Sequence, residues 1–442
     1  SPPRPLHWGF STSAFQVEGS VRADGRSPSI WDQWSHRPNT IADGSNADIA
    51  SDHYARYASD FALMKDQMHP NMYRFSLSWS RIMQPDNKQV NAAAVAHYRA
   101  MIDAMIASGA QPVATLYHWD LPASLMDSCG GWTSPQIVDA FRTYTEAVVD
   151  AFGDKIRYWL TFNEPRAECT KAYRADHFFP PGLNDARLTY ACMHNHVLAH
   201  AAAAAVIRDR AQRTGQAAWV GLAADTEWYE PLTADSAADE AAAQRALEYN
   251  FGWAVDPLVT GDYPASMRAD LRLADGVLPV FTPAQQRAIK GTVDFIGYNY
   301  YTASWAAADD AADAAEGAFR LQQVRGSAAH PEPIGPPTAI DWQRSVPAGL
   351  TKLTRWLAHR YPGMDLWVTE NGVATDGGPQ DPARITFFEE HLRALGLAMP
   401  LATGAAPVVV YLAWSLLDNF EWMQGYTSRF GVIGVDMASP ER

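Results

Sequence analysis

Two glutamates that follow short apolar runs are the side chains of this sequence best placed to do chemistry. Glu164 comes directly after WLTFN (159–163), and Glu370 stands near the end of DLWVTEN (365–371). Cleavage of a glycosidic bond needs two carboxyl groups across a pocket, one protonated to serve the leaving oxygen and one ionised to attack or stabilise the anomeric carbon. The pair therefore indicates glycoside hydrolysis, if the fold brings the two glutamates to one site.

Further polar and aromatic side chains follow other apolar runs and would complete such a site. A nearby cation and hydrogen bonds favour the charged form of a carboxyl group, so Arg74 and the hydroxyl of Tyr301 would hold Glu370 as a carboxylate. Glu164, beside aromatic surface and facing a second carboxylate, is expected to have a raised pKa. The residues expected to bind sugar hydroxyls or to pack on the sugar ring are Gln16, His118, Asn163, Glu421, Trp414 and Trp422.

A framework of alternating strands and helices is expected to position these residues. Short β-rich runs are separated by helix-like segments at 50–68, 91–108, 134–152, 187–212, 236–256, 346–360 and 382–398. Such alternation predicts a parallel sheet, and eight strands in this length favour a (β/α)8 TIM barrel over a doubly wound sheet. The strand ends of a barrel meet at one mouth, which would unite the two glutamates. The eight runs are 7–15, 72–79, 111–119, 157–162, 218–224, 293–301, 365–371 and 407–415.

The longest irregular segment is 303–345, which contains AAADDAADAAEGAF and HPEPIGPP. We expect it to be an insertion after the sixth strand, partly helical and partly a proline-stiffened loop. The whole chain, 1–442, is then expected to form a single glycosidase domain with loop insertions.

The composition excludes several classes of function. A net charge of −14 argues against a nucleic-acid partner, which needs clustered Lys and Arg. No uninterrupted apolar run reaches the roughly 18–20 residues that a membrane span requires, and no glycine-rich phosphate-binding motif follows an expected strand. Cys129, Cys169 and Cys192 lack metal-like spacing, so we expect reduced buried thiols and no disulfide framework.

The first residues, SPPRPLHWGF, contain neither an initiator methionine nor a signal segment. We therefore expect a start that is processed or trimmed, and cytoplasmic residence only as the default.

Several motifs resemble those of glycoside hydrolase family 1, the β-glucosidase family. TFNEP (161–165) and VTENG (368–372) are similar to its acid/base and nucleophile segments. A chance match to one such motif is easy, but ordered matches span nearly the whole chain. The other matching segments are FSTSAFQVEGS (10–20), YRFSLSWSRI (73–82), YHWDLP (117–122), YNYYT (298–302) and WSLLDNFEWMQGYTSRFG (414–431).

The resemblance implies a (β/α)8 barrel and a retaining double displacement, with the two carboxyl groups about 5–5.5 Å apart. Glu164 would be the acid/base and Glu370 the nucleophile, with Tyr301 and Arg74 orienting the nucleophile. Neither a metal nor an organic cofactor is implied. The residues expected to bind the substrate are Gln16, His118, Trp119, Asn163, Asn299, Trp342, Trp414, Glu421, Trp422 and Phe430.

The sequence departs from the family pattern on the side of the leaving group. Arg166 stands where tryptophan usually follows the NEP motif, and Ala348 replaces the usual glutamate in DWQRSVPAGL (341–350). These departures suggest an unusual, anionic aglycone with Arg166 as its contact. Glu421 would repel a sugar phosphate, and position 428 is Ser428, without the lysine of the family's 6-phosphoglycosidases, so an unmodified hexoside is expected.

The leading interpretation is a retaining β-glycosidase that hydrolyses β-D-glucosides, with β-galactosides or β-fucosides as additional substrates. The alternatives are a transglycosylase with an alcohol acceptor and a hydrolase with an anionic aglycone. A non-catalytic glycan-binding relative would be expected to have lost one of the two glutamates. A metal-dependent barrel hydrolase would need a ligand cluster that the strand ends do not show. The expected partner is a small-molecule β-glycoside, and both a monomer and a homo-oligomer stay open.

Overall fold

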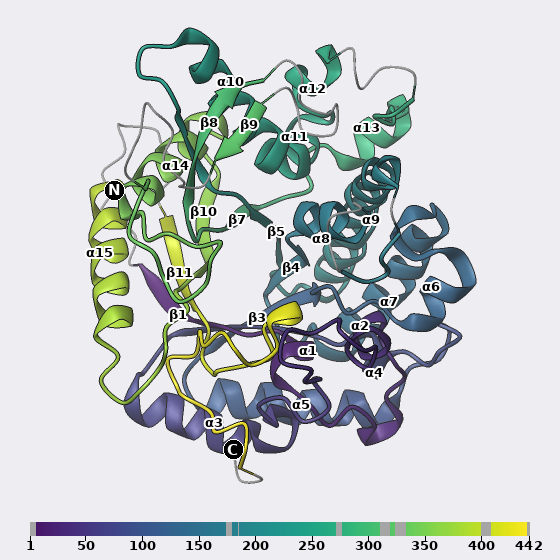
Figure 1. The fold of residues 1–442 in the computed structure, drawn as a ribbon. Coiled ribbons are helices and arrows are strands. Elements are labelled where there is room, and N and C mark those ends of the chain that lie inside the picture. The colour runs from purple at the N-terminus through teal and green to yellow at the C-terminus, as the bar shows by residue number, and fades with distance from the viewer. Residues whose placement is uncertain are drawn as a thin grey trace.

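A closed parallel barrel forms the centre of the structure, a computed structural model that describes residues 6–173, 179–183, 185–270, 276–309, 319–322, 333–398 and 408–439. Its eight strands are ordered β1-β2-β3-β4-β5-β7-β10-β11 and close on β1 (Figure 1). The (β/α)8 TIM barrel expected from the sequence is confirmed. The strands are β1 His7–Ser11, β2 Met72–Ser76, β3 Gln111–Tyr117, β4 Tyr158–Asn163, β5 Trp219–Asp225, β7 Phe295–Asn299, β10 Asp365–Asn371 and β11 Val408–Trp414.

Helices follow the strands and cover the outside of the barrel (Figure 1). The long ones lie in the expected segments: α3 His53–Gln67, α5 Ala92–Ala107, α7 Gln136–Phe152, α9 Ala186–Thr214, α14 Pro347–Arg360 and α15 Pro382–Ala398. The expected segment 236–256 becomes α10 Ala237–Leu247, the π-turn η3 Glu248–Gly252 and α11 Trp253–Thr260. Across the described residues, every helix is too short or too polar to cross a membrane.

Short helices complete the connections between these elements. They are α1 Ala14–Val17, η1 Ala23–Gly25, α2 Ile30–Ser35, α4 Trp79–Ile82, α6 Ala123–Cys129, η2 Gly131–Thr133, α8 Pro165–Tyr173, α12 Ala265–Ala269, α13 Pro283–Ile289 and η6 Trp422–Gln424.

Apolar side chains fill the barrel below the carboxyl ends of its strands. Each strand except β1 contributes to this buried cluster, which contains Met72, Val113, Leu160, Ala223, Phe295, Trp367 and Val410. The rings of Phe295 and Trp367 stack with centroids 4.0 Å apart. Because the interior is packed, a ligand can enter only at the strand ends.

Two irregularities in the barrel occur at the expected catalytic positions. The pairing of β4 with β5 shifts between Leu160 and Asn163, and that of β10 with β7 shifts between Val368 and Glu370. Bulges of this kind re-aim side chains and are frequent next to active sites. The barrel thus departs from regular pairing where it presents Glu164 and Glu370.

Gly372 allows the end of β10 to approach β11. A Cβ atom at this position would lie 1.9 Å from the backbone oxygen of Trp414. Only glycine fits so close a backbone approach, so the glycine of VTENG has a structural reason directly beside Glu370.

The segment 303–345 contains a strand where partial helix was expected. Ala303–Ala308 form β8, which pairs in parallel with β6 (Trp228–Pro231) and antiparallel with β9 (Phe319–Gln322). The helical expectation is therefore wrong for Ala306–Ala308, where pairing with β6 overrides the helix propensity of alanine. The rest of the segment expected to be helical, residues 310–318, lies outside the described residues, as do residues 323–332.

Candidate active site

A cavity of about 420 Å³ opens at the carboxyl ends of the barrel strands. All of the site residues expected from the sequence line it, except Arg74, which is fully buried beneath it. They come from every part of the chain and meet only in the closed barrel. The lining includes Gln16, His118, Trp119, Asn163, Glu164, Asn299, Tyr301, Trp342, Glu370, Trp414, Glu421, Trp422 and Phe430.

Glu370, near the end of β10, has both carboxylate oxygens held by neighbouring side chains. Arg74 Nη1 donates to Oε1 over 2.7 Å, and the Tyr301 hydroxyl donates to Oε2 over 2.7 Å. Arg74 is fixed in turn, since its Nε donates to Thr115 Oγ1 (3.0 Å) and its Nη2 to Asn163 Oδ1 (2.6 Å). Burial raises the pKa of Glu370, while Arg74 and Tyr301 oppose that rise. These contacts favour an ionised carboxylate here.

Glu164 follows β4 in a different environment. Its backbone has φ 44°, a left-handed value that is rare for residues other than glycine, and its N–H donates to Ala223 O over 2.7 Å. Strained conformations of this kind cluster at functional sites. Burial, then the charges of Asp225 and Glu370, raise the pKa of Glu164 to about 8. The two glutamates are therefore biased toward opposite protonation states, as bond cleavage requires.

Asn163, Asn299 and His118 form a hydrogen-bonded network between the two carboxyl groups. Asn299 Nδ2 donates to Glu164 Oε1 over 2.7 Å and to Asn163 Oδ1 over 3.1 Å. Asn163 Nδ2 lies 3.0 Å from His118 Nε2, and burial holds the pKa of His118 well below its ordinary value. A neutral His118 that accepts from Asn163 carries its proton on Nδ1, which has no hydrogen-bond partner among the described residues.

Polar and aromatic groups form the end of the cavity near β1 and β11. Gln16 Nε2 donates to Asn419 Oδ1 (3.0 Å), and Trp414 Nε1 donates to Glu421 Oε1 (3.1 Å). Burial raises the pKa of Glu421 to about 8. The Trp422 ring lies 4.8 Å from that of Trp119. Alternating hydrogen-bonding groups and flat rings are the features that bind a sugar, whose hydroxyls and C–H faces need both.

The cavity wall near β5 and α8 contains charged residues that the sequence did not predict. Asp225 ends β5 and forms an ion pair with Arg166, so this arginine lines the cavity but is already bound to a carboxylate. Lys171 and Glu227 also line the cavity. The sequence did carry a signal for Asp225, because this acidic residue follows an apolar run, as Glu164 and Glu370 do. Lys171 had no such signal, since its place depends on how α8 leaves the barrel.

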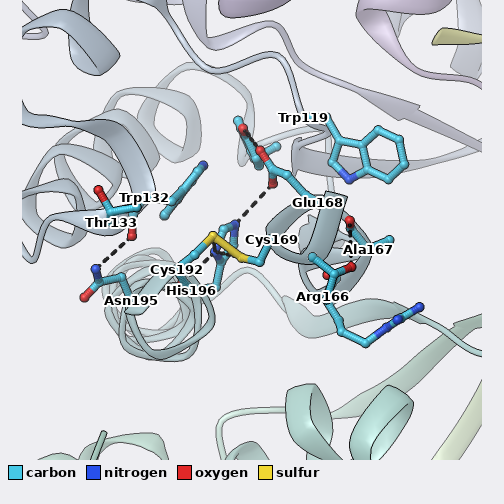
Figure 2. The surroundings of a disulfide bond; sticks show 12 residues. Trp119, Trp132, Thr133, Arg166, Ala167, Glu168, Cys169, Cys192, Asn195 and His196 are labelled. Carbon is cyan, nitrogen blue, oxygen red and sulfur yellow. Dashed lines mark hydrogen bonds and ion pairs between the residues drawn. A yellow bond between two sulfur atoms is a disulfide. The ribbon is translucent and has the colours of Figure 1, made fainter. Parts of the chain in front are cut away.

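Cys169 and Cys192 form a disulfide bond, so the expectation of reduced thiols is wrong for these two (Figure 2). Cys169 lies on α8 and Cys192 on α9, and packing of the two helices brings their Cα atoms within 5.8 Å. Sequence spacing could not show this juxtaposition. Cys129 is free. The two sulfurs and His196 lie close enough together in the described chain to be considered as metal ligands. The two sulfurs are bonded to each other, however, and a disulfide does not offer the thiolates that bind a metal.

The disulfide should stabilise the fold measurably. We expect the Cys169→Ala/Cys192→Ala double variant to lose about 3 kcal/mol of unfolding free energy, because a cross-link over 23 residues limits the unfolded chain. Guanidinium unfolding without a reductant measures the difference. Cys129→Ala is the matched control and should change stability much less. Equal midpoints for wild type and double variant would contradict the expectation.

Comparisons with known proteins agree with this geometry. Residues 2–442 match the sequence profile described as Glycosyl hydrolase family 1. "Beta-glucosidase 4" of Oryza sativa subsp. japonica is 41% identical, with 97% of this chain and 89% of that protein covered. The β-glucosidase of the fungus Humicola insolens in complex with glucose is 36% identical with a TM-score of 0.93, covering 100% and 95% of the two chains. A rice β-glucosidase mutant in a covalent complex with glucose is 36% identical with a TM-score of 0.92, covering 98% and 94%.

Proposed function

Because the chain belongs to glycosyl hydrolase family 1, we propose that it is a retaining β-glucosidase that cleaves β-D-glucosides by double displacement. One observation carries the proposal: two glutamates line the same cavity in environments that favour opposite protonation states. Glu370 is bound by Arg74 and Tyr301, whereas Glu164 is buried and faces other carboxyl groups. Retention requires carboxyl groups about 5–5.5 Å apart, close enough for direct attack on the sugar.

In the first step the Glu370 carboxylate attacks the anomeric carbon from the face opposite the aglycone. The bond between this carbon and the glycosidic oxygen breaks, and the protonated Glu164 gives its proton to that oxygen as the alcohol leaves. A glycosyl ester on Glu370 results. Arg74 and Tyr301 position the attacking carboxylate through the hydrogen bonds described above, and both limit its rotation.

In the second step Glu164, now ionised, takes a proton from water as the water oxygen attacks the anomeric carbon. The ester bond to Glu370 breaks, and the sugar is released with its original β configuration. Glu164 serves as acid and then as base at one position, which suits a group whose pKa lies near the working pH.

The sugar-binding end of the cavity supports a glucoside as substrate. Gln16, His118 and Glu421 offer hydrogen-bonding atoms, with Trp414 and Trp422 beside them. Two relatives point the same way: the Humicola insolens enzyme was crystallised with glucose, and the rice mutant with covalently bound glucose. β-Galactosides and β-fucosides differ from glucosides at positions that these polar groups would contact, so we include them in the test.

Trapping the covalent intermediate tests the proposal. We expect 2-deoxy-2-fluoro-β-D-glucosyl fluoride to inactivate the enzyme and to add one fluoroglucosyl unit to the peptide that contains Glu370, as seen by mass spectrometry. Aryl β-glucosides, β-galactosides and β-fucosides would rank the substrates, and an added alcohol would show how far glycosyl transfer competes with hydrolysis. An adduct on another residue, or turnover with inversion, would refute the proposed mechanism.

A further inference from the structure

Lys171 is a cation on the cavity wall for which the proposed mechanism has no use. It lies on α8, the helix that begins directly after Glu164. Lys171 lines the cavity. Its Nζ lies 5.2 Å from the ring centroid of Trp119 and 5.9 Å from that of Phe179, distances at which aromatic rings attract a cation.

The arginines beside this wall are already paired with carboxylates. Arg166 is paired with Asp225. Arg74 is bound to Glu370 beneath the cavity floor. Within the described chain, by contrast, Lys171 forms no ion pair with a carboxylate. The carboxyl groups of Glu164, Asp225 and Glu421 act on Lys171 only at longer range. Glu164 is protonated when it is ready to act as an acid, Asp225 is already paired with Arg166, and burial raises the pKa of Glu421 to about 8.

A cation in this position favours an anionic ligand. Burial lowers the pKa of Lys171, which means that its charged form lacks part of its hydration. A ligand anion would restore a counter-charge, and charge-assisted hydrogen bonds are among the stronger ones in proteins.

We propose that Lys171 binds an anionic group on the aglycone, so that the enzyme prefers β-glucosides with a negatively charged leaving group. The proposal rests on the proposed function, because it takes the sugar to lie against Gln16, Glu421 and Trp414. Glu164 must face the glycosidic oxygen, and Lys171 lines the same cavity on the helix that begins directly after Glu164. Arg166, expected from the sequence to make this contact, is bound to Asp225 instead.

Figure 2 shows why α8 can present such a group in a fixed position. The disulfide and His196 lie on one side of the helix, toward α9, while Arg166 and Trp119 lie on the other. The covalent link to α9 therefore anchors α8 two residues before Lys171. A rigidly held contact loses less entropy when a ligand binds than a contact from a loose loop would.

Two matched substrates test the proposal: 4-carboxyphenyl β-D-glucoside and its neutral 4-carboxamidophenyl counterpart. We expect wild type to show the higher kcat/KM for the carboxylate. Lys171→Met should lower the ratio of carboxylate to carboxamide kcat/KM roughly 10- to 100-fold, the range expected for one hydrogen bond to a charged group. Lys171→Arg keeps the charge and should restore most of the ratio. An unchanged ratio in Lys171→Met overturns the proposal.

Binding of the corresponding 1-thio-β-D-glucosides, which resist hydrolysis, separates this proposal from the proposed function. Calorimetry should show tighter binding of the thioglucoside carboxylate to wild type and loss of that preference in Lys171→Met, whether or not the enzyme turns over glucosides. Equal binding of both compounds to wild type overturns the proposal even if hydrolysis is fast. A loss of activity that is equal on both substrates, with a shifted pH profile, would overturn it too and assign Lys171 to the ionisation of Glu164.

Discussion

Replacing Glu370 with alanine is expected to lower kcat on every aryl β-glucoside roughly 10⁴- to 10⁶-fold, the scale seen when an enzyme loses its nucleophile. The variant cannot form the glycosyl ester, and the loss should not depend on how good the leaving group is. Steady-state kinetics with a dinitrophenyl and a phenyl glucoside measure both points. KM should change far less, because the groups that would bind sugar hydroxyls stay in place.

External nucleophiles provide the control for Glu370→Ala. Azide can occupy the space left by the carboxylate and attack the anomeric carbon directly, so we expect slow formation of α-glucosyl azide from an activated glucoside. This product shows that the rest of the site is folded and that the missing group acted from the α face. Glu370→Gln, which fills that space, should be equally inactive and should not be rescued. A kcat within tenfold of wild type for either variant would contradict the assignment.

The barrel could be predicted from the sequence because its strands carry a strong local signal. Parallel strands buried on both faces read as continuous apolar runs, and all of β2, β7 and β11 is buried. Helix boundaries were also close, as in α15, which occupies the expected segment 382–398. The π-turn η3 inside the expected segment 236–256 was not predicted, because single π-turns inside α-helices are rare.

The residues of the candidate site that follow barrel strands could be predicted from the sequence. Those whose position depends on the connections between strands were missed. Once the barrel is known, Glu164 and Glu370 must share one mouth, and their surroundings follow from neighbouring strands. The ion pair between Arg166 and Asp225 joins a helix to a strand, and no periodicity encodes that contact. Lys171 was missed for the same reason.

The disulfide could not be predicted from the sequence. Its cysteines belong to α8 and α9, and their pairing is set by how those helices pack. Three cysteines without a regular spacing left the reduced state as the simpler expectation. Tertiary geometry decides such cases, because bond formation requires Cα atoms within about 7 Å.

Replacing Glu164 with glutamine is expected to have an effect that depends on the leaving group. For a phenyl glucoside, whose leaving oxygen needs a proton, kcat/KM should fall roughly 10²- to 10⁴-fold. For a dinitrophenyl glucoside, kcat/KM should change much less, because this leaving group departs without a proton. The second step still lacks its base, so the glycosyl ester on Glu370 should accumulate. Two measurements would show this accumulation. Dinitrophenol should be released in an initial burst, and azide should accelerate turnover of the glycosyl ester and give β-glucosyl azide as product.

The pH profile gives an independent test of the same residue. Glu164 must be protonated to act as the acid, and its pKa is raised to about 8, so wild-type kcat/KM on a phenyl glucoside should fall as the pH rises through about 8. Asp225→Asn is the matched control: Asp225 raises the pKa of Glu164, so its loss should move the fall to lower pH. Glu164→Gln should lack this alkaline limb altogether. If the limb persists unchanged in Glu164→Gln, another group supplies the proton and Glu164 is not the acid.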